Sequence, residues 1–266
     1  MSNIGAYDRI KIARKNGRAT AVDYINGVFT DFVELHGDRN GADDSAVVGG
    51  VAYLKGVPVT VIGTEKGKTA EERVFRNFGM ADPSGYGKAL RLMKQAEKFR
   101  RPIITVVDTQ GAKCDKNAEA KGIGQAIAEN LREMSLLKTP IIAVLIGEAG
   151  SGGALGFAVA DSVFMLENAY YSVITPEGCA GILLGDVKKA SVAAEWLKPS
   201  AEEGMKAGVV DKIIPEPADF SDESLDAYTS KIADALYDEI TRLLKKTETE
   251  LLRDRYEKYR SVGKFF

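Results

Sequence analysis

The residues best able to do chemistry in this chain form a glycine-rich stretch with almost no reactive side chains. The stretch PIIAVLIGEAGSGGALG, Pro140–Gly156, runs from an apolar segment into a cluster of four glycines. The apolar residues Ile141–Ile146 predict a buried strand, and a helix-compatible segment begins at Ala154. At the start of a helix, the backbone N–H groups of glycines are not shielded by side chains and can donate hydrogen bonds to a negatively charged group. The pattern predicts an oxyanion hole, with packing of helix on strand as the weaker alternative.

Side-chain catalysis at this cluster is less well supported. A nucleophile elbow, G-x-S-x-G, would need a glycine where Ala149 stands. The single histidine, His36, is far away in sequence, so Ser151 is predicted to be a small residue that lets the loop turn. The dinucleotide pattern G-x-G-x-x-G fails too, because Leu155 stands at its third glycine. A serine hydrolase is therefore the weakest hypothesis.

A second loop, Gly63–Thr69, also follows a predicted strand. Its sequence, GTEKGKT, is one position shorter between its glycines than a phosphate-binding P-loop. We therefore expect a basic loop at a strand end that touches a ligand phosphate or a partner.

The remaining candidate side chains favour structural roles. Asp108 and Glu148 end their strands in parallel positions, where they could act as acid and base or cap the following loops; we favour the caps. Cys114 and Cys179 have no cysteine or histidine partner at ligand spacing, so we expect no metal site. Cys179 and Trp196 are predicted to pack in the core.

The elements around these loops repeat in shape. Three apolar runs, Ile103–Asp108, Ile141–Ile146 and Tyr170–Thr175, each break at a glycine-containing loop and lead into helical sequence. The first of those helices is expected over about Ala118–Leu137. Strand, loop and helix repeated in this way predict an α/β fold with active loops at the strand ends. The regular spacing favours a superhelix of β-β-α units.

Helical segments are expected at both ends of the chain. Thr20–His36 has apolar residues at helical spacing, and Asp219–Phe266 reads as one long amphipathic helix. Two strands, Ala46–Leu54 and Val57–Gly63, precede the repeated units. The predicted division is a helical N-terminal segment (1–45), a core (46–218) and a C-terminal amphipathic helix (219–266).

Composition excludes several function classes. The 266 residues carry 36 Lys and Arg against 38 Asp and Glu, a net charge of −2, so no basic excess points to nucleic acid or an anionic membrane. Apolar runs are too short for a transmembrane helix, and the charged N-terminus does not resemble a signal peptide. Two cysteines suit a reducing compartment. We expect a cytoplasmic protein.

Several long blocks, in one order, resemble the α subunits of bacterial acetyl-CoA carboxylase carboxyltransferases. The resemblance runs from about Asp23 to Pro217. Its blocks are DYINGVFTDFVELHGDR (Asp23–Arg39), VVGGVA (Val47–Ala52), NFGMADPSGYGKALRLMKQAEKF (Asn77–Phe99), ENLREMS (Glu129–Ser135), IGEAGSGGAL (Ile146–Leu155), YSVITPEGCAGIL (Tyr171–Leu183) and DKIIPEP (Asp211–Pro217).

The resemblance implies a crotonase-type fold and a carboxyl transfer. Carboxybiotin on a separate biotin carboxyl carrier protein would give its carboxyl group to acetyl-CoA, forming malonyl-CoA. The implied partners are a carboxyltransferase β subunit in an α2β2 assembly, the carrier protein and biotin carboxylase. Members of this family largely use backbone oxyanion holes, and the substrate itself would generate the base that the sequence lacks.

The resemblance also implies which residues form the site. The implied catalytic residues are Gly152, Gly153, Gly111 and Ala112. The implied cofactor-binding residues are Gly150, Ser151, Ala154, Pro176, Glu177 and Gly178. A valine at Gly152 or Gly153 is expected to stop turnover and leave the assembly intact, because a side chain would block the approach to backbone N–H groups.

One loop departs from the family pattern. Where the family usually has PGAYPGVGAEERGQ, this chain has QGAKCDKNAEAKGI, Gln110–Ile123. Thr64-Glu65 likewise replaces a usual His-Gln pair, and Gly181 a usual serine. These differences favour a second hypothesis, a paralogous subunit that acts on another acyl-CoA as carboxyltransferase, decarboxylase or hydrolase. A third is a non-catalytic partner subunit, against which the intact Gly150–Ala154 cluster argues.

Overall fold

One mixed sheet forms the centre of the molecule. The computed structural model describes residues 4–217 and 222–263. In this part of the chain, strands are hydrogen-bonded in the order β1-β2-β3-β4-β5-β6-β8, and β7 pairs with β5. The strands are β1 (Thr30–Glu34), β2 (Val47–Leu54), β3 (Val57–Thr64), β4 (Ile103–Thr109), β5 (Ile141–Gly150), β6 (Ser162–Leu166), β7 (Tyr170–Ser172) and β8 (Lys212–Ile214).

The two parts of the sheet differ in direction and burial. The strands β1, β2 and β3 are antiparallel, and a tight turn at Lys55-Gly56, with φ of 48° and 82°, joins β2 to β3. The pairs from β3 onward are parallel. Every residue of β4, β5 and β6 is buried, which explains why their sequences are mainly apolar and do not alternate with polar residues.

The long strand β5 pairs with three other strands, β4, β6 and β7. Its first half pairs with β6 and its last three residues, Glu148–Gly150, pair with β7. On its other side it pairs along its length with β4. The loops that follow β4 and β5 therefore leave the sheet side by side.

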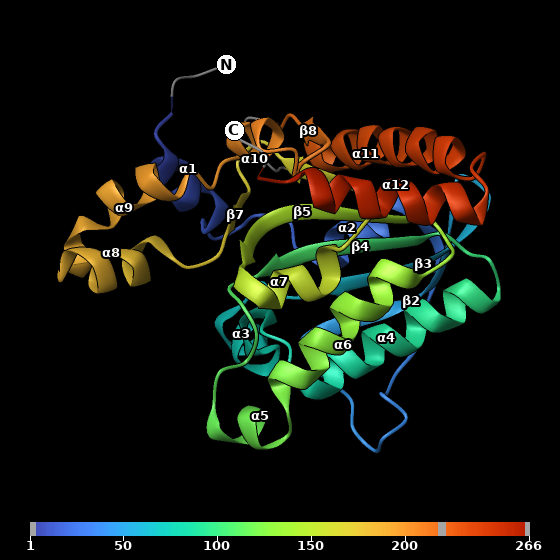
Figure 1. Cartoon of the computed structure of the whole chain (residues 1–266), viewed down its shortest axis with the longest axis horizontal. Coiled ribbons are helices and arrows are strands. Elements are labelled where there is room, and N and C mark those ends of the chain that lie inside the picture. Colours follow the sequence, from blue (N-terminus) through green and yellow to red (C-terminus); the bar gives the residue numbers. More distant parts are fainter. Residues whose placement is uncertain (1–3, 218–221, 264–266) are drawn as a thin grey trace.

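Helices cover both faces of the sheet (Figure 1). In the described residues they are α1 (Ala6–Ala13), α2 (Ala21–Val28), α3 (Ala70–Phe75), η1 (Asn77–Gly79), α4 (Pro83–Lys98), α5 (Lys116–Ala120), α6 (Ile123–Leu136), α7 (Ser151–Ala158), α8 (Pro176–Leu184), η2 (Val187–Lys189), α9 (Ala190–Leu197), α10 (Ala201–Lys206), α11 (Asp222–Leu243) and α12 (Glu248–Ser261). None of the helices in this described part is long and apolar enough to cross a membrane.

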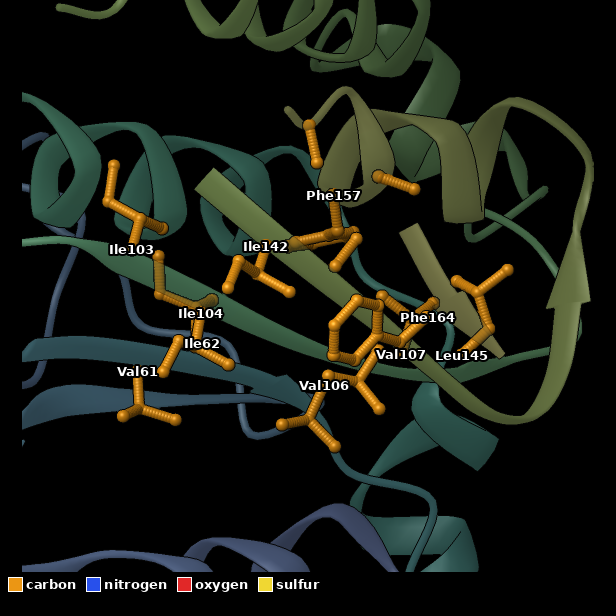
Figure 2. Close-up of a cluster of buried hydrophobic side chains, with 14 of the residues drawn as sticks. Val61, Ile62, Ile103, Ile104, Val106, Val107, Ile142, Leu145, Phe157 and Phe164 are labelled. Carbon is orange, nitrogen blue, oxygen red and sulfur yellow. The ribbon is translucent and has the colours of Figure 1, made fainter. Parts of the chain in front are cut away.

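The core lies between the parallel strands and the helices that flank them. Helices α4 and α7 pack on one face of the sheet with α6 beside them, and α2 packs on the other face with α11 against it. Figure 2 shows side chains of β3, β4, β5 and β6 meeting Phe157 of α7 in one apolar cluster. The predicted α/β class and crotonase-type architecture agree with this arrangement.

Three predicted elements are divided differently in the structure. The predicted helix Thr20–His36 ends at Val28, and β1 follows, so the 1–45 segment is not purely helical. The chain is extended from Phe29 on, with φ of −115° and ψ of 154°, and Thr30, Val33 and Glu34 pair with β2. The predicted helix Ala118–Leu137 is split into α5 and α6 by Gly122, whose φ is 79°.

The C-terminal segment is two helices rather than one. Thr247 and Glu250 form a capping box, which starts α12 after a short turn that follows α11. The amphipathic spacing continues through the turn, which is why the sequence reads as a single helix. The predicted boundary at 218/219 lies outside the described residues.

One buried cation fixes α12 to the body of the protein. Arg255 binds both carboxylate oxygens of Asp161 at 2.8 Å. It also donates to the carbonyls of Met134, Leu137 and Thr139 at 2.8 to 3.1 Å. The side chains of Arg255 and Asp161 are only 1% and 4% exposed. This residue therefore joins α12 to the α6–β5 connection and to the loop before β6.

We expect Arg255→Met to destabilise the chain by about 3–5 kcal/mol, because Asp161 would remain buried without its cation. The measurement is urea unfolding followed by circular dichroism. Arg253→Met on the same helix is the matched control; Arg253 is exposed, and its loss should cost no more than about 0.5 kcal/mol. Equal destabilisation by the two variants would contradict the role of Arg255.

Candidate functional site

The two glycine loops that follow β4 and β5 meet at bare backbone. A Cβ added at Gly153 would lie 2.2 Å from the Gly111 carbonyl carbon and 2.2 Å from the Ala112 nitrogen. A Cβ added at Gly150 would lie 2.0 Å from the Gln110 oxygen. No side chain fits at either position, so the sequence has glycine at both. Three of the four implied catalytic residues, Gly111, Ala112 and Gly153, thus lie in contact.

Helix α7 begins at this contact with uncapped backbone donors. Its N-cap, Gly150, supplies no side-chain hydrogen bond. The N–H groups of Ser151, Gly152 and Gly153 have no partner within the helix, because the helix starts there. The positive end of the helix dipole adds to them. The arrangement can stabilise a negative charge beside Gly152, as an oxyanion hole must.

Ser151 turns the chain from strand β5 into helix α7. Its φ is 54°, a left-handed value that is uncommon for serine, and its side chain is exposed. The single histidine, His36, lies in the loop between β1 and β2 and contacts Asp43 at 3.0 Å. The geometry matches the predicted turning role of Ser151 and gives no support to a serine nucleophile.

A cavity of about 600 Å³ opens beside the start of α7. Ser151 and Gly152 form part of its wall, and Tyr171 and Val173 from β7 and the residues after it form another part. Most of the wall is apolar, and Lys198 is among the few charged residues. A site of this size fits a small bicyclic or acyl group next to the backbone donors.

A buried lysine links the ends of β4 and β5. Lys66 Nζ lies 2.8 Å from Asp108 and 2.7 Å from Glu148. The Glu148 N–H also donates to Asp108, at 2.9 Å. A Cβ added at Gly147 would lie 2.6 Å from the Asp108 carboxylate, so that glycine makes room for the pair. The predicted capping of separate loops by Asp108 and Glu148 is wrong, because the two carboxylates share one cation.

An arginine from α1 extends this network. Arg14 donates to Glu148 at 2.9 Å, to Glu177 at 2.9 Å and to the Tyr170 hydroxyl at 3.2 Å. Tyr170 donates to Glu148 at 2.6 Å. Glu148 therefore accepts from three side chains, and the network reaches from the end of β5 to the start of α8.

The charges in the network hold each other ionised. Burial alone would raise the pKa of Glu148, but Lys66, Tyr170 and Arg14 stabilise its anion and hold the pKa at about 2. Burial alone would lower the pKa of Lys66, but the two carboxylates raise it. Burial and the neighbouring Glu148 raise the pKa of Tyr170. Glu148 is therefore unsuited to act as a general base at neutral pH.

The implied cofactor-binding residues fall into two places. Gly150, Ser151 and Ala154 lie at the start of α7. The other three, Pro176–Gly178, form the first turn of α8, where Thr175 caps the Gly178 N–H. This turn lies outside the wall of the cavity and connects to the glycine loops through Glu177 and Arg14.

Sequence reasoning missed the residues that hold the loops. Arg14 and Tyr170 carried no motif, and Lys66 was expected to touch a ligand or a partner, whereas it is buried between carboxylates. Tyr86 of α4 donates its hydroxyl to the Gly153 carbonyl at 3.0 Å, and the absence of a side chain at Gly156 gives its ring room. The only available signal was the strand-end position of Lys66, Asp108 and Glu148.

Two departures from the family pattern have local structural roles. Glu65 accepts the Val22 N–H at 2.8 Å and the Gly67 N–H at 2.7 Å, so it ties α2 to the loop of Lys66. Asp115 caps α5 by accepting the Ala118 N–H at 2.8 Å. The altered loop Gln110–Ile123 is thus ordered around a short helix. Across residues 4–217 and 222–263, no group of three or more His, Cys, Asp or Glu residues is placed to hold a metal ion.

The fold that holds the paired glycine loops is of the crotonase type. A malonate decarboxylase hetero-tetramer from Pseudomonas has a chain of the same fold, with a TM-score of 0.69 and 17% identity over 89% of this chain and 92% of that one. The family described as acetyl co-enzyme A carboxylase carboxyltransferase-like matches residues 1–263. This chain belongs to that family.

Curated relatives agree over nearly the whole chain. The carboxyl transferase subunit alpha of acetyl-coenzyme A carboxylase from Streptococcus pyogenes is 54% identical over 251 residues, 94% of this chain and 96% of the relative. A protein from Natranaerobius thermophilus named as subunits beta/alpha is 51% identical over 97% of this chain. This chain spans 43% of that fused relative.

We expect Glu148→Gln to destabilise the chain by about 3–5 kcal/mol at pH 7, because Lys66 and Arg14 would lose a buried anion. The pKa of Glu148 is about 2 in the fold against an ordinary 4.5. Its contribution to stability is therefore complete above pH 4.5 and is lost as the pH falls toward 2. Urea unfolding at several pH values should show a shallower acid dependence in the variant.

The control for this substitution is Glu257→Gln, which changes an exposed carboxylate on α12. It should alter stability by no more than about 0.5 kcal/mol and keep the acid dependence of the wild type. An unchanged acid dependence in Glu148→Gln would contradict the assigned role of the network.

Two neighbouring glycines should respond differently to alanine. Gly153→Ala should lower stability by about 1–3 kcal/mol, because its Cβ would collide with the backbone of Gly111 and Ala112. Gly152→Ala should be neutral or stabilising by up to about 1 kcal/mol, because its nearest neighbour is the Ile127 side chain at 3.8 Å. Thermal unfolding of the two variants is the measurement, and equal behaviour would contradict the close approach.

This difference corrects one expectation from the sequence. A side chain at Gly153 would disturb the loop itself, so loss of turnover there would not separate chemistry from folding. Gly152 is the position at which a side chain tests the hole without forcing the backbone apart.

Proposed function

We propose that this chain is the α subunit of an acetyl-CoA carboxylase carboxyltransferase. It would transfer the carboxyl group of carboxybiotin, held on a separate biotin carboxyl carrier protein, to acetyl-CoA and so form malonyl-CoA. The proposed assembly is α2β2 with a carboxyltransferase β subunit, working in the cytoplasm with biotin carboxylase.

The observation that carries this proposal is the pair of glycine loops at the start of α7. Carbon–carbon bond formation on acetyl-CoA passes negative charge to an oxygen atom, which needs donors more than it needs a titratable side chain. Main-chain N–H groups at Ser151–Gly153 supply such donors, and Gly111 and Ala112 lie against them. Glu148 and Asp108, the nearest carboxylates on the two strands, are occupied by Lys66.

The cavity beside Gly152 supports carboxybiotin as the donor. Its apolar wall suits a fused bicyclic ring, and the donors at its edge suit the ureido oxygen. When bound, carboxybiotin supplies the carboxyl group and, once that group has left, a basic ureido nitrogen. This chain's part is to bind and orient the ring and to neutralise developing negative charge with N–H groups.

A second candidate function keeps the site and changes the acyl group. The loop Gln110–Ile123 lies directly beside the hole, and its lysine at 113 and cysteine at 114 replace family residues. Lys113 is held by a backbone hydrogen bond to Ala81, so its side chain has a fixed origin near the site. A paralogous carboxyltransferase, decarboxylase or hydrolase for another acyl-CoA would differ at this loop. A non-catalytic partner subunit would not need the glycine contacts to be kept.

The test is a reconstituted assay with radiolabelled bicarbonate. The chain is co-expressed with a β subunit and supplied with biotin carboxylase, biotinylated carrier protein, ATP and acetyl-CoA. Labelled malonyl-CoA should form, and omission of this chain or of the carrier should abolish it. An intact heteromer that forms no product would overturn the proposal.

The same assay separates the second candidate. A panel of acyl-CoA substrates, each with and without carrier, should show the highest kcat/KM for acetyl-CoA with carrier. A preference for another acyl-CoA, or turnover without carrier, would support the second candidate instead.

A further inference from the structure

A pair of helices stands apart from the sheet and exposes apolar side chains. The α8–α9 arm comprises α8, η2 and α9, Pro176–Leu197, and Figure 1 shows it beyond the edge of the sheet with α1 beside it. Five large apolar side chains of this arm are between 45% and 74% exposed: Ile182, Leu183, Val187, Val192 and Trp196. The predicted core position of Trp196 is therefore wrong, whereas Cys179 is buried as expected.

Exposed apolar side chains are more concentrated on this arm than is usual for a surface that faces only water. The sequence of α8, PEGCAGILL, carries a single charge, so the helix has apolar residues on nearly every side. Helices of this kind are covered on more than one face in the folded assembly. Its inner side packs on α9 through Cys179 and Ala180, which leaves Ile182 and Leu183 outside. A contiguous apolar patch of this sort marks a protein interface.

A groove continues the patch toward α1. It has a volume of about 480 Å³ and lies between α1 and α9. Tyr7 and Lys11 line one side, and Val192 and Trp196 line the other. The groove thus contains an exposed tryptophan together with the charged residues Asp8, Lys11 and Glu195, and tryptophan is enriched among the residues that dominate binding at interfaces.

The arm is connected to the catalytic loops. Arg14 joins Glu177, on the first turn of α8, to Glu148 at the end of β5. Glu148 shares Lys66 with Asp108, the residue that precedes the second glycine loop by two positions. A partner bound on the arm would therefore be connected to the end of β5 through two ion pairs that share Arg14.

We propose that the α8–α9 arm is the surface onto which the carboxyltransferase β subunit docks, an inference that rests on the proposed function. In the fused relative from Natranaerobius thermophilus, β and α subunits form one polypeptide, of which this chain spans 43%. The malonate decarboxylase chain of the same fold comes from a hetero-tetramer. The fused relative thus contains a further β part, and the malonate decarboxylase chain has further chains beside it in its tetramer. A β subunit on the arm would be linked to the end of β5 through Glu177 and Arg14, and so to the site that it would help to complete.

The only tryptophan of the chain reports on this surface. The full chain is labelled with 5-fluorotryptophan, and its single ¹⁹F resonance is recorded with and without unlabelled β subunit. Binding should shift the resonance and remove its H₂O/D₂O isotope effect, because Trp196 would leave water. An unchanged resonance in a complex proven by size-exclusion chromatography would overturn the inference.

Substitution tests the same surface by affinity. The double variant Ile182→Asp/Leu183→Asp should weaken binding to the β subunit at least about tenfold, because two carboxylates would be buried without partners. The matched control is Leu136→Asp at the end of α6; Leu136 is 59% exposed at the opposite edge of the sheet. Both variants should keep the far-ultraviolet circular dichroism of the wild type. Equal binding by the double variant and the control would overturn the inference.

Two further outcomes identify another occupant or another function. A ¹⁹F shift that grows with the concentration of this chain alone would assign the arm to a second copy and overturn the inference. A complex that binds through the arm and forms no malonyl-CoA would contradict the proposed function and leave the docking surface supported.

Discussion

The close approach of two bare backbone segments is the constraint on which the rest of the site depends. Gly150 and Gly153 lie so near to Gln110, Gly111 and Ala112 that a Cβ would fall 2.0–2.2 Å from main-chain atoms. Such contact is possible only because β4 and β5 are parallel neighbours whose loops leave the sheet at the same edge. The glycines allow the approach, and the approach places the first N–H groups of α7 beside the second loop.

The charged side chains around the two glycine loops hold this geometry. In the protonation states that they have in the structure, they take no part in proton transfer. Lys66 bridges Asp108 and Glu148, and Arg14 adds a second cation to Glu148. A carboxylate with its pKa held at about 2 stays ionised at neutral pH, so it can orient its neighbours but accepts no proton there. Tyr86 fixes the Gly153 carbonyl from the opposite side. Buried side chains that pair with one another thereby hold the main-chain N–H donors in position.

Much of this arrangement could be predicted from the sequence, because its signals are local. Apolar runs ending in glycine predicted β4, β5 and the start of α7, since such runs are buried strands whatever surrounds them. The end of α2 and the break between α11 and α12 were missed, because apolar spacing continues through both. Arg14, Lys66 and Tyr86 were missed because their partners are distant in sequence, from 42 residues for Lys66 and Asp108 to 163 residues for Arg14 and Glu177. The core position predicted for Trp196 was wrong, because helical spacing shows which residues share a face of the helix but not whether another element covers that face.

The central claim, that main-chain donors at the start of α7 carry the carboxyl transfer, is tested most directly at Gly152. The measurement is kcat for malonyl-CoA formation by a purified complex of the Gly152→Val chain with the β subunit, compared with the wild-type complex. We expect a loss of about 10²–10³-fold with the complex intact, since the side chain keeps the substrate from the N–H groups. A rate within a few-fold of the wild type would contradict it.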